Sequence, residues 1–295
     1  MKRRAIITLH NNEMYSSSKV GGKASNLLKL TKWKYTVPPG FILSTDFFEE
    51  VMAHTPLSSI LKKITLKDQT KIVRFVAQIR NIILSTPFPR PMQHEVYTIF
   101  DALRLDRVSV RSSSTVEDGL CHSFAGYFET YLHVKRSEII KRIIDCWIAT
   151  YSERVVKYVT RTEIPIGTVK PALIIQRMIV PDKAGVIFTR NVYTGNRNEL
   201  IIESCDGLGN QVVDAEVEPS RYIVQKNTKN IIRSTIGFPA IGLLHLSQIH
   251  RLVHEALSIE SRFRYPQDIE WALVNDTPYI LQARPIAHMH NSSYY

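Results

Sequence analysis

Four polar side chains near the end of the chain have the types and the spacing that magnesium and phosphate chemistry requires. They lie in the segment 267–284, where two alternating stretches flank an Asn-Asp-Thr-Pro sequence and predict a β-hairpin. Because successive side chains of a strand point to opposite faces, Asp268 and Glu270 share one face of the first strand, and Gln282 and Arg284 share one face of the second. Two carboxylates suit Mg²⁺, and a guanidinium suits phosphate.

The opposite face of this hairpin is predicted to be buried. Its residues are apolar: Ile269, Trp271, Leu273, Leu281 and Ala283. Burial of that face would hold the four polar groups side by side over a rigid sheet. Taken alone, the segment also fits a surface hairpin with solvated charges, which is the usual environment of Asp, Glu and Arg.

A second candidate for phosphate binding is the Val-Gly-Gly-Lys sequence that ends at Lys23. Glycines before a helix start, here predicted over 24–30, expose backbone N–H groups and the positive end of the helix dipole, which favour a phosphate. Lys23 would add a point charge. The sequence lacks the full GxxxxGK[ST] pattern, so a Gly-Gly turn with a solvated lysine explains it equally well.

Arg111 ends a predicted strand over 108–111 and is followed by four small hydroxyl residues. An arginine at the end of a strand can bind phosphate oxygens in a bidentate manner. The Ser-Phe-Ala-Gly segment that ends at Gly126 could close over such a phosphate. The alternative is a polar turn in which Arg111 forms a structural ion pair.

Two further segments indicate contacts with a nucleoside. The apolar stretch 173–180 contains Gln176 and Met178, and such a strand could offer its backbone edge to an adenine ring while Met178 packs on the ring face. A plain core strand fits this stretch as well. Glu203 precedes a Gly-Leu-Gly sequence and could reach a ribose or a metal, although a carboxylate that caps a glycine turn explains it equally.

The elements that would position these residues follow from periodicity. Helices are predicted over 46–54, 69–84, 138–160 and 246–262, a strand over 41–43, and several strands between 172 and 224. Gly167, Thr168 and Pro171 interrupt the pattern. We therefore expect an N-terminal lobe over 1–168, a C-terminal lobe over 169–287, and a disordered tail over 288–295.

Composition bounds the class of protein. The chain has 295 residues, 44% of them hydrophobic, which is enough to bury a large core in two domains. No apolar run has the length of a membrane span, and no signal peptide is recognisable. Three widely spaced cysteines indicate neither a disulfide framework nor a zinc site. A reducing, cytoplasmic location is expected.

The net charge of +11 is concentrated in the first 90 residues, which contain 15 basic and 5 acidic residues. Such an asymmetry indicates an anionic partner, although a solvated basic face is the simplest explanation. The lysine-rich stretch 62–71 lacks interleaved aromatic residues. A dedicated nucleic-acid site is therefore not expected.

Taken together and in order, these motifs resemble the nucleotide-binding domain of the pyruvate phosphate dikinase, phosphoenolpyruvate synthase and rifampin phosphotransferase family. The resemblance covers about residues 19–286. It rests on the segments 20–27, 37–41, 110–126, 176–178, 184–189, 207–209, 219–222, 267–271 and 281–286. Ala24 departs from the family pattern, where a glycine is common.

The resemblance implies an α+β, two-lobed ATP-grasp-like fold that holds Mg-ATP in a cleft between the lobes. By position, Lys23 and Arg111 look like phosphate ligands, and Gln176 and Met178 look like the adenine hinge. Asp268 and Glu270 look like magnesium ligands. The same comparison makes Gln282 a partner of the metal and Arg284 a partner of the phosphate.

The resemblance also implies an ATP-dependent phosphotransferase in which the β-phosphate of ATP passes to a histidine, with release of AMP and the γ-phosphate. The similarity ends at Ile286, so we expect a free-standing subunit that acts on a histidine of a separate domain or protein. Two alternatives stay open: an ATP-grasp kinase that phosphorylates a small molecule directly, and a non-catalytic nucleotide-binding regulatory module.

Overall fold

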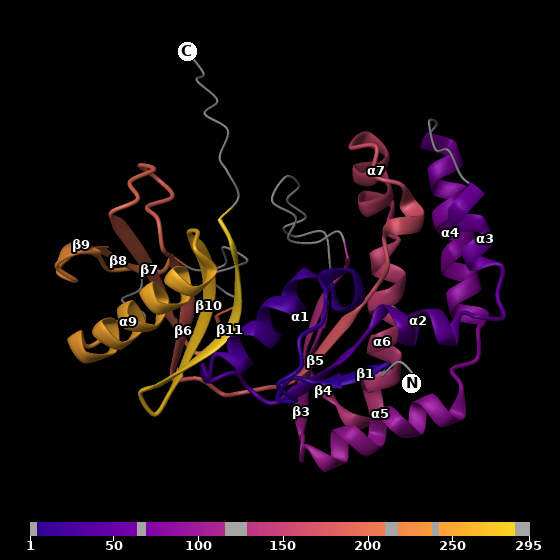
Figure 1. Cartoon of the computed structure of the whole chain (residues 1–295), viewed down its shortest axis with the longest axis horizontal. Coiled ribbons are helices and arrows are strands. Elements are labelled where there is room, and N and C mark those ends of the chain that lie inside the picture. Colours follow the sequence, from indigo (N-terminus) through magenta and orange to yellow (C-terminus); the bar gives the residue numbers. More distant parts are fainter. Residues whose placement is uncertain (1–4, 64–68, 116–128, 210–217, 238–241, 287–295) are drawn as a thin grey trace. The chain divides into compact units, whose positions relative to one another are not determined.

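The computed structural model of the chain describes residues 5–63, 69–115, 129–209, 218–237 and 242–286 (Figure 1). The chain forms two compact units. The first comprises residues 1–28 and 39–178, and the second comprises residues 29–38 and 179–295.

The first unit is built on a five-stranded antiparallel sheet with the strand order β1-β2-β5-β3-β4. The strands are β1 (Ile6–Thr8), β2 (Gly40–Leu43), β3 (Arg107–Ser112), β4 (Thr130–Lys135) and β5 (Leu173–Arg177). The central strand β5 pairs with β2 on one side and with β3 on the other. Arg111 and Gln176 therefore lie on neighbouring strands of one sheet.

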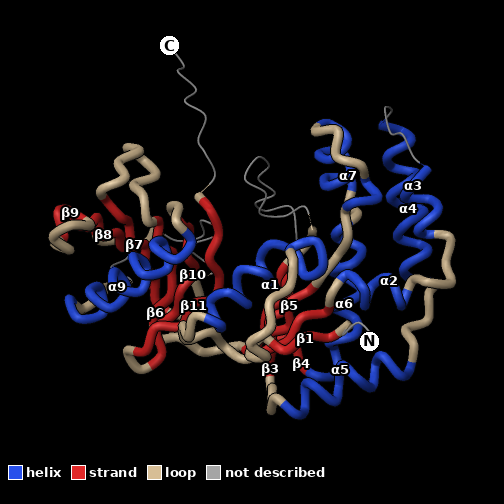
Figure 2. The backbone as a smooth tube through the Cα atoms, viewed as in Figure 1, coloured by secondary structure: helices blue, strands red, loops and turns tan. Residues whose placement is uncertain are grey.

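The unit also contains seven helices among its described residues, of which α6 packs against β3 and β4 (Figure 2). They are α1 (Ser17–Lys32), α2 (Thr45–Val51), α3 (Leu57–Lys63), α4 (Gln69–Ser85), α5 (Arg90–Ala102), α6 (Ile139–Thr150) and α7 (Glu153–Arg161), with short 3₁₀ turns at Arg136–Glu138 and Ile166–Thr168. The division between the two units falls within α1, whose residues from Lys29 onward belong to the second unit.

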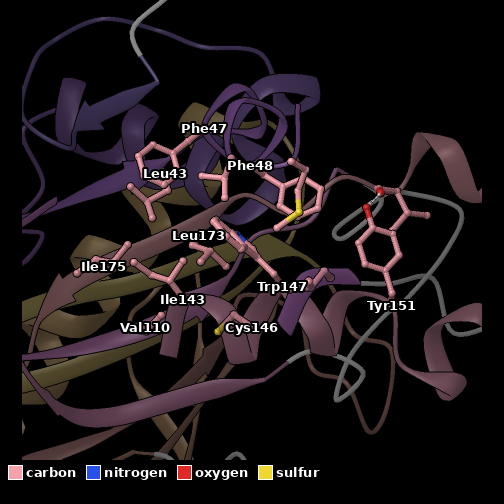
Figure 3. Close-up of a cluster of buried hydrophobic side chains, with 14 of the residues drawn as sticks. Leu43, Phe47, Phe48, Val110, Ile143, Cys146, Trp147, Tyr151, Leu173 and Ile175 are labelled. Atoms are coloured by element: carbon pink, nitrogen blue, oxygen red, sulfur yellow. Dashed lines mark hydrogen bonds between the residues drawn. The ribbon is translucent and has the colours of Figure 1, made fainter. Parts of the chain in front are cut away.

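The core of the first unit lies on one face of its sheet (Figure 3). Leu43, Val110 and Ile175 project from three adjacent strands and pack with Phe48 of α2 and Trp147 of α6. All of these side chains are almost completely buried. Because side chains alternate along a strand, the residues between them point to the other face of the sheet.

The predicted helix over 138–160 is interrupted in the structure. α6 ends at Thr150 and α7 begins at Glu153. Ser152 has extended backbone angles and its side chain accepts a hydrogen bond from Val155 N, so it caps a new helix. The expectation of one continuous helix was therefore wrong, because an N-cap serine lies inside the periodic stretch.

The second unit contains a six-stranded antiparallel sheet with the strand order β11-β10-β6-β7-β8-β9. Its elements are β6 (Lys183–Phe188), β7 (Glu199–Asp206), β8 (Ser220–Gln225), β9 (Ile231–Thr235), β10 (Gln267–Val274), β11 (Thr277–Pro285) and the helix α9 (Leu246–Phe263). The helix packs against β10. It buries Ile249, Leu252, Val253 and Ala256.

The predicted hairpin is formed by β10 and β11, which pair antiparallel. The connection is the two-residue turn Asn275-Asp276, and both residues have positive φ angles of 47° and 61°. Two-residue hairpin turns of this kind match the twist of the strands, and Asn and Asp tolerate the left-handed conformation. The turn is thus shorter than the four-residue sequence that predicted it.

In this hairpin, Ile280 is buried at the position where Leu281 was expected to be buried. The register shifts between Glu270 and Trp271, so that Trp271 lies opposite Ile280. Ile280 is 2% exposed, whereas Leu281 is only half-buried. A β-bulge inserts one extra residue and changes the face on which the following side chains lie. The expected burial of Leu281 was therefore wrong, while Ile269, Trp271, Leu273 and Ala283 are buried as predicted.

Both units combine antiparallel sheets with helices, which confirms the predicted α+β class. The division after residue 178 differs from the predicted one after residue 168, because β5 pairs within the first sheet. β5 ends at Arg177, where the predicted strand extended to 180. Among the described residues, no helix combines the length and the apolar character needed to cross a membrane.

Candidate functional site

In the second unit, strand pairing gathers the predicted metal and phosphate groups on one face of the sheet. Asp268 lies directly opposite Arg284, and Glu270 lies directly opposite Gln282. Directly opposed residues of antiparallel strands project to the same face. Two carboxylates, an amide and a guanidinium therefore lie on one face of β10 and β11 as two opposed pairs, as the alternation predicted.

Asp268 and Arg284 are joined by an ion pair. Arg284 Nε and one terminal nitrogen each lie 2.8 Å from Asp268 Oδ2. The side chains are 12% and 28% exposed, so the pair is shielded from water on most sides. The predicted phosphate ligand and a predicted magnesium ligand thus hold each other in position by charge-assisted hydrogen bonds.

Glu203 lies on the same face as Glu270. Val186 of β6 is paired with Glu270 on one side and with Glu203 on the other, so all three side chains share one row across the sheet. Glu203 is 7% exposed. Glu203 therefore adds a third carboxylate to this face, two strands away from Glu270. This position agrees with a contact between Glu203 and a different part of the ligand that Glu270 would bind.

Two residues that the sequence analysis did not single out orient Glu203. Its Oε1 atom accepts a hydrogen bond of 2.7 Å from Arg221 Nε and one of 2.9 Å from the hydroxyl of Tyr193. The guanidinium of Arg221 also lies over the Tyr193 ring, 4.6 Å from its centroid. Burial and the Glu203 carboxylate raise the pKa of Tyr193, so the phenol stays protonated and continues to donate.

Periodicity could not have found this cluster, because it depends on the pairing of β7 with β8; the family resemblance included Arg221 in segment 219–222 but gave it no role. Arg221 lies directly opposite Glu203 in that pair. Tyr193 comes from the connection between β6 and β7. Alternation predicts which face a side chain occupies within its own strand, but not which strand lies beside it.

In the first unit, Arg111 and Gln176 share the face of the sheet opposite to the main core. Arg111 pairs with Ile174, and Gln176 pairs with Gly40 and Ser109. Arg111 is 8% exposed and Gln176 is 2% exposed. Both polar side chains are therefore largely buried, which is unusual for an arginine and requires polar or charged neighbours.

Lys23 is positioned by a kink in α1. Gly21 has φ 77° and ψ 168°, which breaks the helix one turn after its start. The hydroxyl of Ser113 accepts a hydrogen bond of 3.0 Å from Ala24 N and donates one of 2.9 Å to Val20 O. Ser113 thus caps the helix that restarts beyond the kink, and it fixes the backbone on both sides of Lys23.

Lys23 and Arg111 are both placed relative to Ser113. Arg111 precedes Ser113 by two residues, and Ser113 N continues the sheet by donating to Ala172 O at 2.8 Å. Their side chains therefore point to the same side, on which Ser113 contacts α1. The two predicted phosphate ligands of the first unit come from opposite sides of one hydrogen-bonded junction.

The proposed adenine hinge is less open than the sequence suggested. Both edges of β5 are paired through Gln176, so that its backbone groups are used within the sheet. Met178 N donates to Arg107 O at 2.8 Å. The side chain of Arg177 reaches Leu103 O at 2.9 Å and ties the strand end to α5. The backbone N–H groups of Gln176 and Met178 are thus engaged within the unit.

The remaining predicted contact of the phosphate region is Gly126. It lies outside the described residues, as does the whole segment 116–128.

Within the described parts of the chain, no group of three or more His, Cys, Asp or Glu side chains forms a metal site. The hairpin offers Asp268, Glu270 and the amide oxygen of Gln282, which are hard oxygen donors. Mg²⁺ is commonly held by one or two carboxylates together with substrate phosphates and water. This donor set therefore fits Mg²⁺ that arrives with a nucleotide, and it does not fit a zinc site.

Comparison with known proteins gives one family match over nearly the whole chain. Residues 17–245 and 239–294 match the family described as "Pyruvate phosphate dikinase, AMP/ATP-binding domain".

Relatives that cover most of the chain include a probable phosphoenolpyruvate synthase of Methanothermobacter thermautotrophicus and a rifampicin phosphotransferase of a Streptomyces species. The first is 30% identical over 90% of this chain and 43% of its own length. The second is 31% identical over 97% of this chain and 36% of its own length. The chain thus spans about two fifths of these relatives.

Among solved structures, a D-alanine–D-alanine ligase from Bacillus anthracis is similar with a TM-score of 0.27 and 8% identity. The alignment covers 83% of this chain and 85% of the ligase. That likeness is too low to support an inference.

Proposed function

Because the chain belongs to the family of pyruvate phosphate dikinase AMP/ATP-binding domains, we propose that it binds Mg-ATP as the nucleotide-binding part of an ATP-dependent phosphotransferase. The two α+β units agree with the ATP-grasp-like fold of the sequence-based resemblance. The observation that carries the proposal is the alignment of Asp268, Glu270, Gln282 and Arg284 on one face of the second sheet.

In the second unit, Asp268, Glu270 and Gln282 would hold Mg²⁺ through their side-chain oxygens. Arg284 binds a phosphate group. Its ion pair with Asp268 keeps the guanidinium oriented. Glu203, held by its two donors, accepts from a ribose hydroxyl or adds a ligand to the metal.

In the first unit, Lys23 and Arg111 bind phosphate oxygens. Their support is the junction at Ser113, which fixes both segments. Gly126, which lies outside the described residues, is proposed as a further phosphate contact. Gln176 and Met178 are proposed as adenine contacts through their side chains and the Met178 carbonyl, because their backbone N–H groups are used in the fold.

These groups act by electrostatics. Phosphoryl transfer places negative charge on the oxygens of the transferred group, and positioned cations stabilise that charge without a covalent nucleophile on this chain. Mg²⁺ would neutralise the same oxygens when bound. Lys23, Arg111 and Arg284 are the proposed catalytic residues. The acceptor is a histidine on a separate domain or protein. Its nitrogen takes the β-phosphoryl group and AMP leaves, while a water molecule takes the γ-phosphoryl group, which is released as inorganic phosphate.

The test follows the two phosphate labels separately. The chain is incubated with β-labelled or γ-labelled ATP and cell extract, and proteins and small molecules are separated. Label from the β position on an acid-labile protein adduct, together with AMP, supports the proposal. Formation of ADP with a labelled small molecule, in the absence of any partner protein, would show a direct kinase instead. Binding without turnover would leave a regulatory module.

A reducing compartment such as the cytoplasm is part of the proposal. Cys146 and Cys205 are free thiols buried in the two units. Burial raises the pKa of both thiols, so they remain protonated and unreactive.

A further inference from the structure

One helical surface of the first unit carries positive charge that the described residues do not neutralise. Between residues 51 and 94, the sequence contains seven lysines and arginines and one acidic residue. Lys62 of α3 and Lys71, Arg74 and Arg80 of α4 are exposed. With the residues that the structure describes, none of these four forms an ion pair or a side-chain hydrogen bond.

Some cations on other helices of this unit do have partners. Arg142 of α6 lies 3.1 Å from Asp145, and Lys157 of α7 is paired with Glu153. α4 has no acidic residue at all, and Lys71 lies in its first turn. A cation there faces the positive end of the helix dipole, which is unfavourable. Carboxylates of a partner at this end would remove that unfavourable interaction.

The outer surface of α4 is not uniformly polar. Val73, Ala77, Arg80 and Leu84 follow the spacing i, i+4, i+7 and i+11, so they form one row along the helix. Val73 is 49% exposed and Leu84 is 54% exposed. Val73 and Leu84 do not belong to the core of the unit. The opposite face of α4 packs into that core through Ile72, Phe75, Ile79 and Ile83.

A second row lines a groove beside the first. Arg74, Gln78, Asn81 and Ser85 have the same spacing. Together with the apolar residues Pro56, Ala77 and Ile82 they border an open groove of about 580 Å³. The groove thus combines an apolar lining with a guanidinium, two amides and a hydroxyl. A row of apolar and cationic side chains beside a row of hydrogen-bonding groups is the surface that an amphipathic helix recognises.

We propose that α4, with Pro56 and α3, is a docking surface for an acidic amphipathic helix of a partner protein. Charge complementarity determines the sign of the partner, and the exposed Val73 and Leu84 determine its apolar side. Single-stranded nucleic acid is disfavoured, because the exposed face of α4 presents no aromatic ring on which bases could stack. The surface is independent of the proposed nucleotide ligands, so the two proposals can fail separately.

The experiment uses the full chain and a displayed library of randomised helical peptides, with no nucleotide present. Peptides enriched on the chain are synthesised, and their Kd values are measured by fluorescence anisotropy. We expect enriched sequences to combine Asp or Glu with apolar residues at helical spacing. The variant Lys71→Glu/Arg74→Glu/Arg80→Glu should weaken binding at least about tenfold, because three attractions become repulsions.

The matched control is Arg197→Glu/Lys229→Glu/Arg233→Glu, which reverses the same charge at exposed positions of the second unit. It should change Kd by less than about twofold. Val73→Ser/Leu84→Ser leaves the charge unchanged and should still weaken binding about threefold or more. Circular dichroism establishes that each variant is folded, and the milder Lys71→Gln/Arg74→Gln/Arg80→Gln variant replaces the charge reversal if it is not.

Three results would overturn the proposal. The first is enrichment of peptides that are not acidic, and the second is equal loss of binding in the two charge-reversed variants. The third is displacement of the peptide by a single-stranded oligonucleotide or by phosphatidylserine vesicles at lower concentration than by the peptide itself. That last result would assign the surface to phosphate groups rather than to a protein.

Discussion

The carbonyl oxygen of Ser113 occupies the place that a side chain at Gly21 would need. A Cβ atom built on Gly21 would lie 1.7 Å from Ser113 O, and Gly21 has a φ of +77°. The closeness of these two backbones lets the Ser113 hydroxyl reach both Val20 and Ala24. Lys23 takes its position from this contact.

Gly21→Ala is therefore predicted to disrupt the junction. The backbone conformation of Gly21 is almost restricted to glycine, and the clash is with backbone, which cannot rotate away. We expect a loss of more than about 3 kcal/mol in the free energy of unfolding, or a folded variant with at least about tenfold weaker ATP binding. Chemical denaturation and calorimetry measure the two quantities.

Gly195→Ala is the control for this change. Gly195 has the same φ of +77°, but the nearest atom to its added Cβ would be the end of the Arg190 side chain at 3.2 Å. Only the backbone strain should remain, at about 1 kcal/mol. Equal effects of the two substitutions would show that the approach of Ser113 has no special role.

Ser113→Ala is predicted to destabilise the chain by about 1–3 kcal/mol, because it leaves a buried backbone N–H at Ala24 without its acceptor. Ser204→Ala serves for comparison. Its hydroxyl is fully buried in the second unit and has no hydrogen-bond partner among the described residues. Removal of that group should be neutral or stabilising. The unfolding temperatures of the two variants are compared. Ser113→Ala removes a hydroxyl together with its hydrogen bonds, whereas Ser204→Ala removes only a hydroxyl.

The bulge in the hairpin predicts an inequality between two neighbours. Ile280→Ala should cost about 2–5 kcal/mol, because Ile280 is 2% exposed and lies opposite Trp271. Leu281→Ala should cost less than about 1.5 kcal/mol, because Leu281 is half-buried. The free energies of unfolding of the two variants are measured in urea. A larger loss for Leu281→Ala than for Ile280→Ala would contradict the bulge and would agree with uninterrupted alternation along the hairpin.

Arg221→Ala tests the support of Glu203. Without its 2.7 Å partner, the nearly buried carboxylate keeps only Tyr193 as a donor among the described residues, and we expect at least about fivefold weaker nucleotide binding. Arg233→Ala removes an exposed cation from the adjacent strand β9 and should leave binding unchanged. An equal loss of nucleotide affinity in both variants would show that the effect of Arg221→Ala comes from the change in net charge and not from the orientation of Glu203.

Local patterns in the sequence predicted much of the fold and part of the site. Alternation placed Asp268 and Glu270 on one face, and helical periodicity placed the buried stripe of α4. Both features depend on residues a few positions apart. The sequence also pointed to Lys23 and Arg111, since glycine turns and strand ends are visible locally.

The rest depends on contacts between distant residues. Ser113 and Ala24 are separated by 89 positions, and no pattern announces their hydrogen bond. The pairing of Glu203 with Arg221 follows from the order of strands, and the bulge at Leu281 changes the register without any glycine to mark it. The helix break before Glu153 could have been predicted locally. A Ser-Glu sequence is a recognisable helix start, but the hydrophobic periodicity continues across it.

The most direct test of the central claim measures ATP binding by Glu270→Gln with and without Mg²⁺, using calorimetry. Glu255→Gln on α9 is the control, since it removes the same charge from the same unit. We predict that Glu270→Gln weakens Mg-ATP binding at least about tenfold, and that neither variant changes binding of ATP alone by more than about twofold. Equal affinity of the two variants for Mg-ATP would contradict the assignment of the hairpin as the magnesium and phosphate site.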